Sequence, residues 1–419
     1  MEQEEARWFM GIDWASQAHQ VWLGDGRGMK LGERSFEHSG AGLAEMANWA
    51  LKLSGAPAGA IHVAIEVPHG PVVEHLMERG FRLHAINPKQ ADRFRDRFSP
   101  AGAKDDSRDA HVLGDALRTD PRAFRALSPT EPEVIELREW SRMLEELRQE
   151  QTRLANRMRD QLWRYYPQAL TLAGADLARD WFLELWALAP TPQKAERLRK
   201  DTVERLLKRH RIRRIDAAGV LEALRGAPLQ VEPATVKAAS AHIQQLVKRL
   251  ALIGRQIREA QASLDLSLDA AGQTQEQTPG QPQEQRDATI LRSLPGAGRI
   301  VTATLLAEAS DPLRRRDYHA LRCLAGAAPI TKRSGKSLHV QRRRAANRRL
   351  GDALYHWARV ASQCEPVSQA KYKALRQRGH SHARALRSVG DRLLAVACAM
   401  LQSRTLFNKS HHRDTKRVQ

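Results

Sequence analysis

The hydrophobic positions in the first third of the chain follow two alternating spacings. Short apolar runs rich in β-branched and aromatic residues predict a β-hairpin and two further strands, over residues 8–22, 61–67 and 82–86. Apolar residues at helical spacing predict helices over residues 40–53 and 71–79. Strands that alternate with helices are typical of a layered α/β fold, which we expect for residues 1–130.

From residue 132 onward the apolar positions change to a heptad pattern, with alternating steps of three and four. One seam runs from Leu137 to Tyr165 and a second from Val236 to Leu264. Two long heptad helices predict a coiled-coil helical arm over residues 131–271. The same pattern fits an intramolecular helical hairpin and a seam between two copies of the chain, and both arrangements can hold together.

The remainder of the chain is predicted from composition and helical spacing. Residues 272–285 are rich in glutamine and low in complexity, which predicts a flexible linker. Helical spacing then predicts an all-α C-terminal domain over residues 286–409, followed by a disordered basic tail over residues 410–419. Near the start of this domain, a P-G-A-G turn before an apolar run predicts a helix-hairpin-helix-like turn.

The net positive charge of the chain comes from its last third. Among 419 residues there are 68 Lys and Arg against 48 Asp and Glu, a formal net charge of +20. Residues 286–419 hold 28 of the basic and 8 of the acidic groups, so residues 1–285 are balanced with 40 of each. A basic excess confined to the last third predicts a polyanionic partner there.

The cysteines and the ends of the chain indicate the compartment. Cys323, Cys364 and Cys398 have no paired spacing, which favours a reducing compartment and argues against a structural zinc site. The first residues lack signal-peptide character, and the longest apolar run is too short to span a bilayer. We therefore expect a cytoplasmic protein without a membrane partner, associated with the nucleoid if its polyanionic partner is DNA.

Four carboxylates occupy positions that we expect to meet at one edge of the predicted sheet. Asp13 lies near the end of the first strand, Glu66 lies in a later strand, and Asp106 and Asp109 are three residues apart on one face of a predicted helix, a face that Asp105 can share. Singly, each has a structural explanation, as a turn cap, a buried acid with a partner, or a solvated first helical turn. Together they repel one another unless divalent cations lie between them, which indicates Mg²⁺ or Mn²⁺ and phosphodiester chemistry.

A second candidate centre surrounds Ser334, which is followed by Gly335. A hydroxyl surrounded by many cations is well placed to contact a phosphodiester. In the simpler interpretation, this segment only binds the DNA backbone and Ser334 is a hydroxyl in a loop. Ser337 is the rival nucleophile, three residues on. The residues predicted to bind nucleic acid at this end are Gly296, Gly298, Arg299, Lys332, Arg333, Lys336, Arg342, Arg343 and Arg344.

Both ends of the chain resemble one family, the DEDD-type transposases of insertion sequences (the IS110 family). The motifs G-I-D-W-A-S at 11–16, A-I-E-V-P at 64–68 and K-D-D-S-R-D-A at 104–110 resemble its resolvase-like domain, which has a ribonuclease-H-like fold. The P-G-A-G turn and the segment C-L-A-G-A-A-P-I-T-K-R-S-G-K-S at 323–337 resemble its C-terminal transposase domain. Each motif is weak alone, and the set is specific.

The resemblance implies a recombinase that cuts and rejoins DNA strands. Asp13, Glu66, Asp106 and Asp109 would bind Mg²⁺ (or Mn²⁺), and Ser334 would form a covalent link to DNA. It also implies guidance by a structured RNA from the element's own non-coding end. A homo-oligomer is implied as well, a dimer or tetramer in which the acids and the serine come from different subunits.

One departure from the family affects the metal ligands. The family has K-T-D where this chain has Lys104, Asp105 and Asp106, so Asp105 can replace Asp106 as a ligand. Two other functions stay open. One is a metal-dependent nuclease of the Holliday-junction type without a covalent intermediate, and the other is a nucleic-acid-binding regulator that has lost catalysis. The four intact acids disfavour the regulator, and Ser334 separates the transposase from the nuclease.

Overall fold

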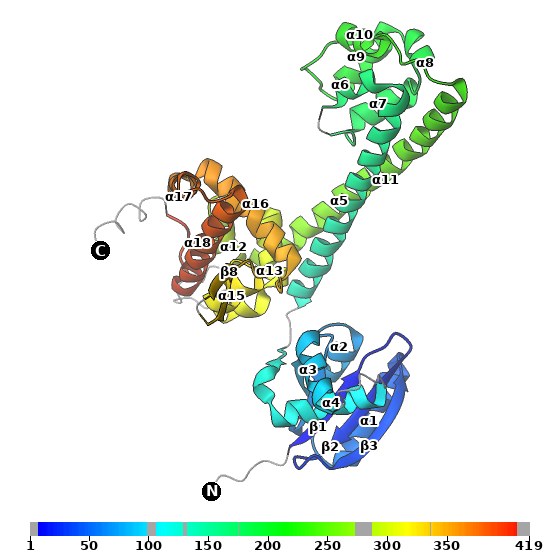
Figure 1. Cartoon of the computed structure of the whole chain (residues 1–419). Helices are drawn as coiled ribbons and strands as arrows, with labels where there is room; N and C mark the ends of the chain where they lie inside the picture. Colours follow the sequence, from blue (N-terminus) through cyan, green and yellow to red (C-terminus); the bar gives the residue numbers. More distant parts are fainter. Residues whose placement is uncertain are drawn as a thin grey trace, which may run out of the picture. The chain divides into compact units, whose positions relative to one another are not determined.

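The computed structural model describes residues 7–98, 106–128, 132–174, 176–272, 287–335 and 337–408. They belong to two compact units, Met1–Pro129 and Thr130–Gln419. The first is a sheet covered by helices and the second is mostly helical (Figure 1). The predicted linker after Gly272, the basic tail, Asp105 and Lys336 lie outside the described residues, and the proposed division of the second unit into arm, linker and C-terminal domain stays a prediction.

The first unit is built on a six-stranded mixed sheet in the order β3-β2-β1-β4-β5-β6. Strand β1 runs parallel to β4, and β4 runs parallel to β5, while the other neighbours are antiparallel. This confirms the prediction of a mixed α/β N-terminal fold. The strands are β1 (Trp8–Asp13), β2 (Ala18–Gly24), β3 (Lys30–Glu37), β4 (Ile61–Ile65), β5 (Arg82–Ala85) and β6 (Arg125–Ala126).

Alternate residues of the strands bury the two faces of this sheet. Met10 and Ile12 pack on one side in a core that includes residues of α1 (Gly40–Ser54) and α2 (Pro71–Glu78). Phe9 and Ala64 pack on the other side with residues of α3 (Pro88–Phe98) and α4 (Asp106–Thr119). The sheet is therefore the middle of three layers, and α4 covers the face that carries the candidate site.

The close approach of α4 to β1 depends on two glycines. A Cβ atom on Gly11 would lie 1.9 Å from the Ala110 carbonyl oxygen and 2.5 Å from the Gly114 nitrogen, both backbone atoms of α4. A Cβ atom on Gly114 would in turn meet the Trp22 ring at 2.6 Å and the Gly11 nitrogen at 3.0 Å. Neither position has room for a side chain, so the helix backbone rests directly on the strand.

We expect Gly11→Ala to destabilise the first unit by about 3 kcal/mol, because overpacking against backbone atoms cannot be relieved by a rotamer change. Calorimetric unfolding of the full chain measures the loss. Gly40→Ala is the control, because Gly40 begins a helix and a Cβ atom there meets nothing within 4 Å. A Gly11→Ala protein as stable as the Gly40→Ala protein would contradict the close-approach interpretation.

The second unit is organised by two long helices, α5 (Pro132–Tyr165) and α11 (Pro233–Gly272). They lie side by side in Figure 1, and the buried positions of α11, such as Leu246 and Ile253, follow the predicted heptad seam. The seam is thus filled within one chain, as the intramolecular hairpin alternative predicts. Coiled-coil geometry and a seam between copies both stay predictions.

Between the two long helices the chain forms a cluster of short helices. Its core contains Trp186, which stacks on Phe182 and makes a tilted ring contact with Tyr166, and it continues into the apolar seam of α5 and α11. The helices are α6 (Leu170–Ala173), α7 (Asp180–Leu188), α8 (Pro192–Glu196), α9 (Lys200–Arg209) and α10 (Ala217–Arg225).

The C-terminal helices pack around Trp357. Trp357 is fully buried and donates its indole N–H to the Pro295 carbonyl oxygen at 2.9 Å. The helices are α12 (Asp287–Ser293), α13 (Arg299–Glu308), α14 (Ser310–Arg314), α15 (Tyr318–Leu324), α16 (Arg348–Cys364), α17 (Pro366–Gln377) and α18 (His382–Ser403). Helices α12 and α13 flank the P-G-A-G turn, and no helix among the described residues is long and apolar enough to cross a membrane.

A buried polar joint connects α13 to α5. Arg142 Nε lies 2.9 Å from Glu308 Oε1, and Asn347 donates to Glu308 Oε2 at 2.7 Å. Burial raises the pKa of Glu308, but the hydrogen bonds from Arg142 and Asn347 outweigh it and lower that pKa. Beside this joint, Leu137 and Leu264 share a small core with Ala303. The C-terminal helices and the long helices are therefore parts of one packed structure.

The prediction of an entirely helical C-terminal domain is wrong in one segment. Residues 330–341 form a two-stranded antiparallel sheet, β7 (Ile330–Ser334) and β8 (Ser337–Gln341). Every residue of the hairpin except Ile330 is exposed among those described. Because neither face of the hairpin packs on the core, the apolar spacing that normally reveals a strand is missing from the sequence.

Candidate active site

Asp13 and Glu66 lie at the same edge of the sheet. Asp13 is the last residue of β1, and its neighbour Ile12 pairs in parallel register with Ile65, the last residue of β4. Glu66 follows Ile65 directly, so it lies just beyond the strand and not inside it as predicted. Because the carboxyl ends of neighbouring parallel strands meet at one edge, the two carboxylates come from adjacent positions of the sheet.

Glu66 and Asp109 are brought together by a cation, Arg95 of α3. Arg95 Nη2 lies 2.6 Å from Glu66 Oε1, and Arg95 Nε lies 2.9 Å from Asp109 Oδ1. The Asp109 side chain is only 11% exposed and that of Glu66 is 24% exposed. The third nitrogen, Nη1, contacts Asp92, which is one helical turn earlier. Sequence reasoning missed Arg95, because α3 was not predicted.

A further acid, Glu33 of β3, is linked to the first turn of α4. A hydrogen bond from Lys30, reinforced by one from Ser107, lowers the pKa of Glu33 to about 2. Lys30 Nζ lies 2.5 Å from Glu33 Oε2, and Gln20 donates to Glu33 Oε1 at 2.9 Å. Ser107 belongs to α4, so this ionised carboxylate helps to hold the turn that carries the helical acids.

Asp106 is the first residue of α4, three positions before Asp109, which confirms the predicted spacing on one helix. Residues three apart on a helix share a face, which is the reason for the prediction that the two acids act together. Its side chain is outside the described part of the structure, and so is Asp105. The choice between Asp105 and Asp106 as a ligand therefore stays a prediction.

The acids fit a divalent metal in the kind of donor they offer. Within the described ranges, no three His, Cys, Asp or Glu side chains lie close enough to hold a metal ion. Glu66 and Asp109 nevertheless share one cationic group, and carboxylate oxygens are the ligands that Mg²⁺ and Mn²⁺ prefer. In this structure the shared positive charge is the guanidinium of Arg95.

Ser334 lies at the tip of the β7–β8 hairpin, fully accessible to a large substrate. It pairs in register with Ser337, and between them Gly335 has a φ of 52°, a left-handed conformation that favours glycine. Because Lys332 pairs with His339 and side chains alternate along a strand, these two residues share the face of Ser334 and Ser337. One face of the hairpin thus presents two hydroxyls, an ammonium and an imidazole.

The predicted nucleic-acid ligands fall into two groups. Lys332, Arg333, Arg342 and Arg344 are exposed on or just after the hairpin. Arg299, in contrast, forms ion pairs with Asp265 at 2.5 Å and Asp269 at 2.6 Å, both in α11. At the turn, a Cβ atom on Gly296 would lie 2.8 Å from the Ala361 nitrogen of α16. These contacts give the turn a structural role, and its binding of nucleic acid stays a prediction.

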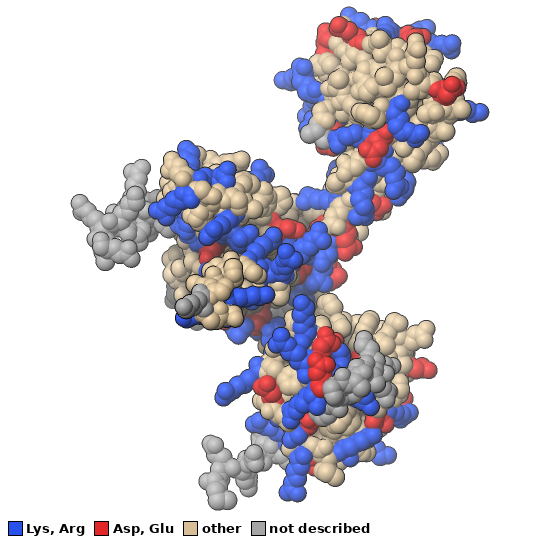
Figure 2. Space-filling view, viewed as in Figure 1, with Lys and Arg blue, Asp and Glu red and all other residues tan. Residues whose placement is uncertain are grey.

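Two arginines of α18, Arg384 and Arg387, extend the basic surface that includes Arg342. Burial lowers the pKa of the Arg387 guanidinium, and the nearby charges of Arg342 and Arg384 lower it further. No acidic side chain in the described part of the chain forms an ion pair with any of these three. Figure 2 shows many Lys and Arg side chains on the visible face of the segment formed by α12–α18. Sequence reasoning found the charge excess but not this cluster.

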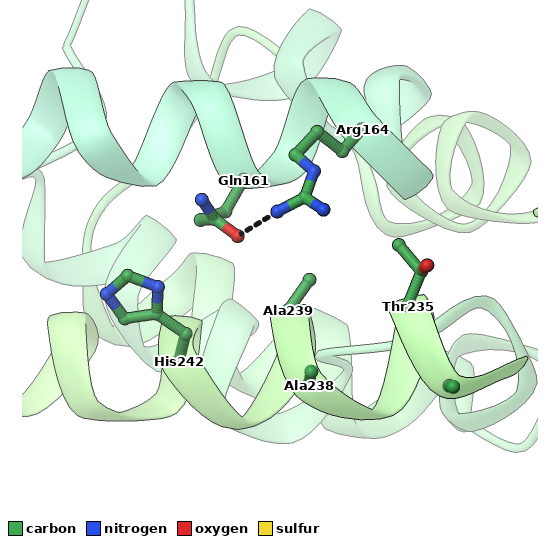
Figure 3. A pocket seen from close by; sticks show the side chains of 7 residues that line it. Gln161, Arg164, Thr235, Ala238, Ala239 and His242 are labelled. Carbon is green, nitrogen blue, oxygen red and sulfur yellow. Dashed lines mark hydrogen bonds between the residues drawn. The ribbon is translucent and has the colours of Figure 1, made fainter. Parts of the chain in front are cut away.

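A depression between the two long helices is separate from both candidate centres (Figure 3). It has a volume of about 450 Å³, and Arg164 donates to Gln161 at its rim, at 3.1 Å. The residues that line it include no carboxylate, which leaves it without a metal ligand of the expected kind. They are Gln161, Arg164, Ala234, Thr235, Ala238, Ala239 and His242.

Comparison with known proteins gives a consistent result at both ends of the chain. Residues 10–167 match a transposase family named for DEDD and IS110, and residues 288–373 match the transposase family IS116/IS110/IS902. A protein of Streptomyces coelicolor named "Mini-circle putative transposase for IS117" is 33% identical over 407 residues, 96% of this chain and 95% of that protein.

A second relative is more similar over a shorter region. A protein of Sinorhizobium fredii named "Putative transposase y4uE" is 63% identical over 210 residues, which cover 50% of this chain and 58% of that protein. A third, the "Insertion element IS110 uncharacterized 43.6 kDa protein" of Streptomyces coelicolor, is 29% identical over 74% of this chain and 73% of its own length.

Proposed function

This chain belongs to the IS116/IS110/IS902 family of transposases, and we propose that it cuts and rejoins DNA strands with a carboxylate cluster that binds Mg²⁺ or Mn²⁺ and with a serine nucleophile. The observation that carries the proposal is the shared cation of Glu66 and Asp109 at the sheet edge where Asp13 ends β1. We take the mixed sheet to be the ribonuclease-H-like fold expected of a DEDD transposase.

In this proposal Asp13, Glu66, Asp106 and Asp109 hold the metal, and Ser334 reacts with the DNA. When bound, the divalent ion would polarise the phosphodiester and make an attacking hydroxyl a better nucleophile. Attack of Ser334 Oγ on phosphorus forms a serine–phosphate ester, breaks one P–O bond and leaves the serine proton on the released strand hydroxyl. Attack of another strand hydroxyl on that ester rejoins DNA and regenerates the serine.

The surroundings of Ser334 support this role. A serine hydroxyl is a weak nucleophile at neutral pH and needs a base or a metal to activate it. Lys332 on the same hairpin face, with Arg342 beyond it, can hold the phosphate and stabilise charge on its oxygens. The acids belong to the first unit and Ser334 to the second, so a homo-oligomer, a dimer or tetramer, could supply them from different subunits.

A structured guide RNA from the element completes the proposal and gives its test. The full chain is purified with its RNA and incubated with Mg²⁺ and the DNA that flanks its gene. We expect joined DNA products that require both RNA and metal. Products that form equally well after ribonuclease treatment would remove the guide from the proposal, and cleavage without joining would favour the Holliday-junction-type nuclease.

The Arg342, Arg384 and Arg387 cluster gives a separable prediction for nucleic-acid binding. Arg387→Met removes a repelling, partly buried charge, so we expect unchanged or higher folding stability together with weaker binding to nucleic acid. Loss of one phosphate contact lowers the slope of log affinity against log salt by about 0.9 on duplex DNA. Salt titrations of the full chain by fluorescence anisotropy measure this slope.

Arg322→Met is the matched control for this measurement. Arg322 is also an arginine of the C-terminal helices, but it pairs with Asp391 at 2.5 Å. Its replacement is expected to lower stability and to leave the salt slope unchanged. The opposite pattern in the two variants, with Arg387→Met less stable and binding normally, would mean that the cluster serves packing and not phosphate binding.

A further inference from the structure

Arg95 has an unusual set of partners for a single side chain. Each of its three guanidinium nitrogens contacts a different carboxylate: Nη2 that of Glu66, Nε that of Asp109 and Nη1 that of Asp92. The Arg95 side chain is 24% exposed, so these contacts are partly shielded from water. Charge-assisted hydrogen bonds in such a setting are stronger than surface ion pairs.

Two of these carboxylates are acids that the proposed function assigns to metal. Glu66 directly follows β4 and Asp109 belongs to α4, and both turn an oxygen to the same guanidinium. Without a cation between them, two carboxylates that are close enough to contact one guanidinium would repel each other. Arg95 therefore supplies the positive charge that keeps the pair together in the metal-free protein.

A guanidinium and a divalent ion that bind the same oxygens repel each other, because both carry positive charge. Glu66 Oε1 and Asp109 Oδ1 face Arg95 nitrogens at hydrogen-bond distance, so a metal that binds these oxygens directly is repelled by the positive charge of Arg95 and displaces it. The long arginine side chain can leave by rotation about its own bonds, without unfolding α3. The cost of breaking these contacts is subtracted from the metal's binding free energy.

We propose that Arg95 is a built-in counter-ion that competes with the divalent cation: it holds Glu66 and Asp109 in place when no metal is bound and withdraws when metal binds. This inference rests on the proposed metal role of the two acids. It makes Arg95 a positioning residue, which preserves the geometry of the acids and lowers the affinity for metal. Metal occupancy then responds to the metal concentration over a higher range than the acids alone would set.

The test measures Mn²⁺ binding to the full chain without DNA, by titration calorimetry and by the loss of the free Mn²⁺ electron paramagnetic resonance signal. Arg95→Met keeps an unbranched side chain about as long as the aliphatic part of arginine and removes the charge. We expect it to bind Mn²⁺ about tenfold more tightly or better, since charged hydrogen bonds no longer have to be broken. In chelator it should melt at a lower temperature than wild type, and Mn²⁺ should raise its melting temperature by more.

Arg118→Met is a closely matched control. Arg118 pairs with Asp115 of α4 at 2.6 Å, and the exposed fractions of the two side chains, 25% and 12%, resemble those of Arg95 and Asp109. It should lose stability and keep wild-type Mn²⁺ affinity. If Arg95→Met fails to fold, Arg95→Lys carries the test. One ammonium cannot reach all three carboxylates, so affinity should rise by a smaller factor.

Glu66→Gln separates this inference from the proposed function. If Glu66→Gln loses Mn²⁺ binding while Arg95→Met and Arg95→Lys bind as wild type does, the acids are metal ligands and the counter-ion inference is wrong. If Glu66→Gln binds as wild type does, the metal role of the acids is wrong as well. Weaker Mn²⁺ binding by Arg95→Met would also overturn the inference, because it would make Arg95 a support of the metal site.

Discussion

A Ser334→Ala protein is expected to lose both the covalent protein–DNA adduct and the joined DNA product, by roughly a thousandfold or more, as when a nucleophile is removed from an enzyme. The reason is positional. Ser334 is exposed at the tip of the hairpin, on the same face as Lys332, where a phosphodiester can approach without moving the core. A denaturing gel with labelled DNA, Mg²⁺ and co-purified RNA shows the adduct as a protein-linked band that survives boiling.

Ser337→Ala provides the control, because the structure makes the two serines near equivalents. They pair directly across the hairpin, share a face and are both exposed. We expect Ser337→Ala to keep the adduct and the joined product. If the two variants behaved in reverse, Ser337 would be the nucleophile. If Ser334→Ala still joined DNA with no adduct in the wild type, the serine would be a phosphate ligand and cleavage would be hydrolytic.

Replacing Glu66 with glutamine is expected to lower strand cleavage by at least about a hundredfold and to leave DNA affinity nearly unchanged. The amide keeps the size of the side chain but removes a negative oxygen from the proposed metal ligands, whereas the basic excess lies in residues 286–419. Cleavage assays over a range of Mg²⁺ concentrations, beside anisotropy measurements of DNA binding, separate the two effects. Asp13→Asn should behave in the same way.

Asp115→Asn is the control for acid replacement on the same layer of the fold. Asp115 and Asp109 belong to α4, and each is 8% exposed when the whole residue is counted. Asp115 pairs with Arg118, however, and was not assigned to the site. We expect Asp115→Asn to lose some stability and to cleave DNA normally. Equal loss of cleavage in Asp115→Asn and Glu66→Gln would show that the assay reports folding of the unit and not metal binding.

The parts of the site that sequence could predict are those fixed by a strand or a helix period. Asp13 follows a clear apolar run, and Asp106 and Asp109 share a helix whose buried face contains Ala110 and Leu113. The seam of α11 was predicted for the same reason, since its apolar residues repeat over many turns. In each case one face of the element is buried, so apolar residues recur in the sequence at a regular spacing.

The parts that sequence missed have no such period. Helix α3 has the sequence P-K-Q-A-D-R-F-R-D-R-F, in which Ala91 is buried and most other positions are charged, so no apolar period reveals the helix or distinguishes Arg95 from its charged neighbours. Strand β3 is mostly exposed, so Glu33 was overlooked. The partners of both residues come from other elements, and a contact between distant segments leaves no local pattern.

The contacts between α5 and α13 set a minimum time for this protein to finish folding during its synthesis. Arg138 donates to the Ala307 carbonyl oxygen, a partner 169 residues further along the chain, and Arg142 pairs with Glu308, 166 residues on. At about 5–20 residues per second, these partners leave the ribosome roughly 10–30 s after α5 does. Until then the small core that contains Leu137 and Leu144 lacks the part that α13 contributes, Ala303. Premature termination before residue 307 therefore yields a chain whose second unit lacks part of its core, and exposed apolar surface of this kind makes a chain a substrate for chaperones and proteases.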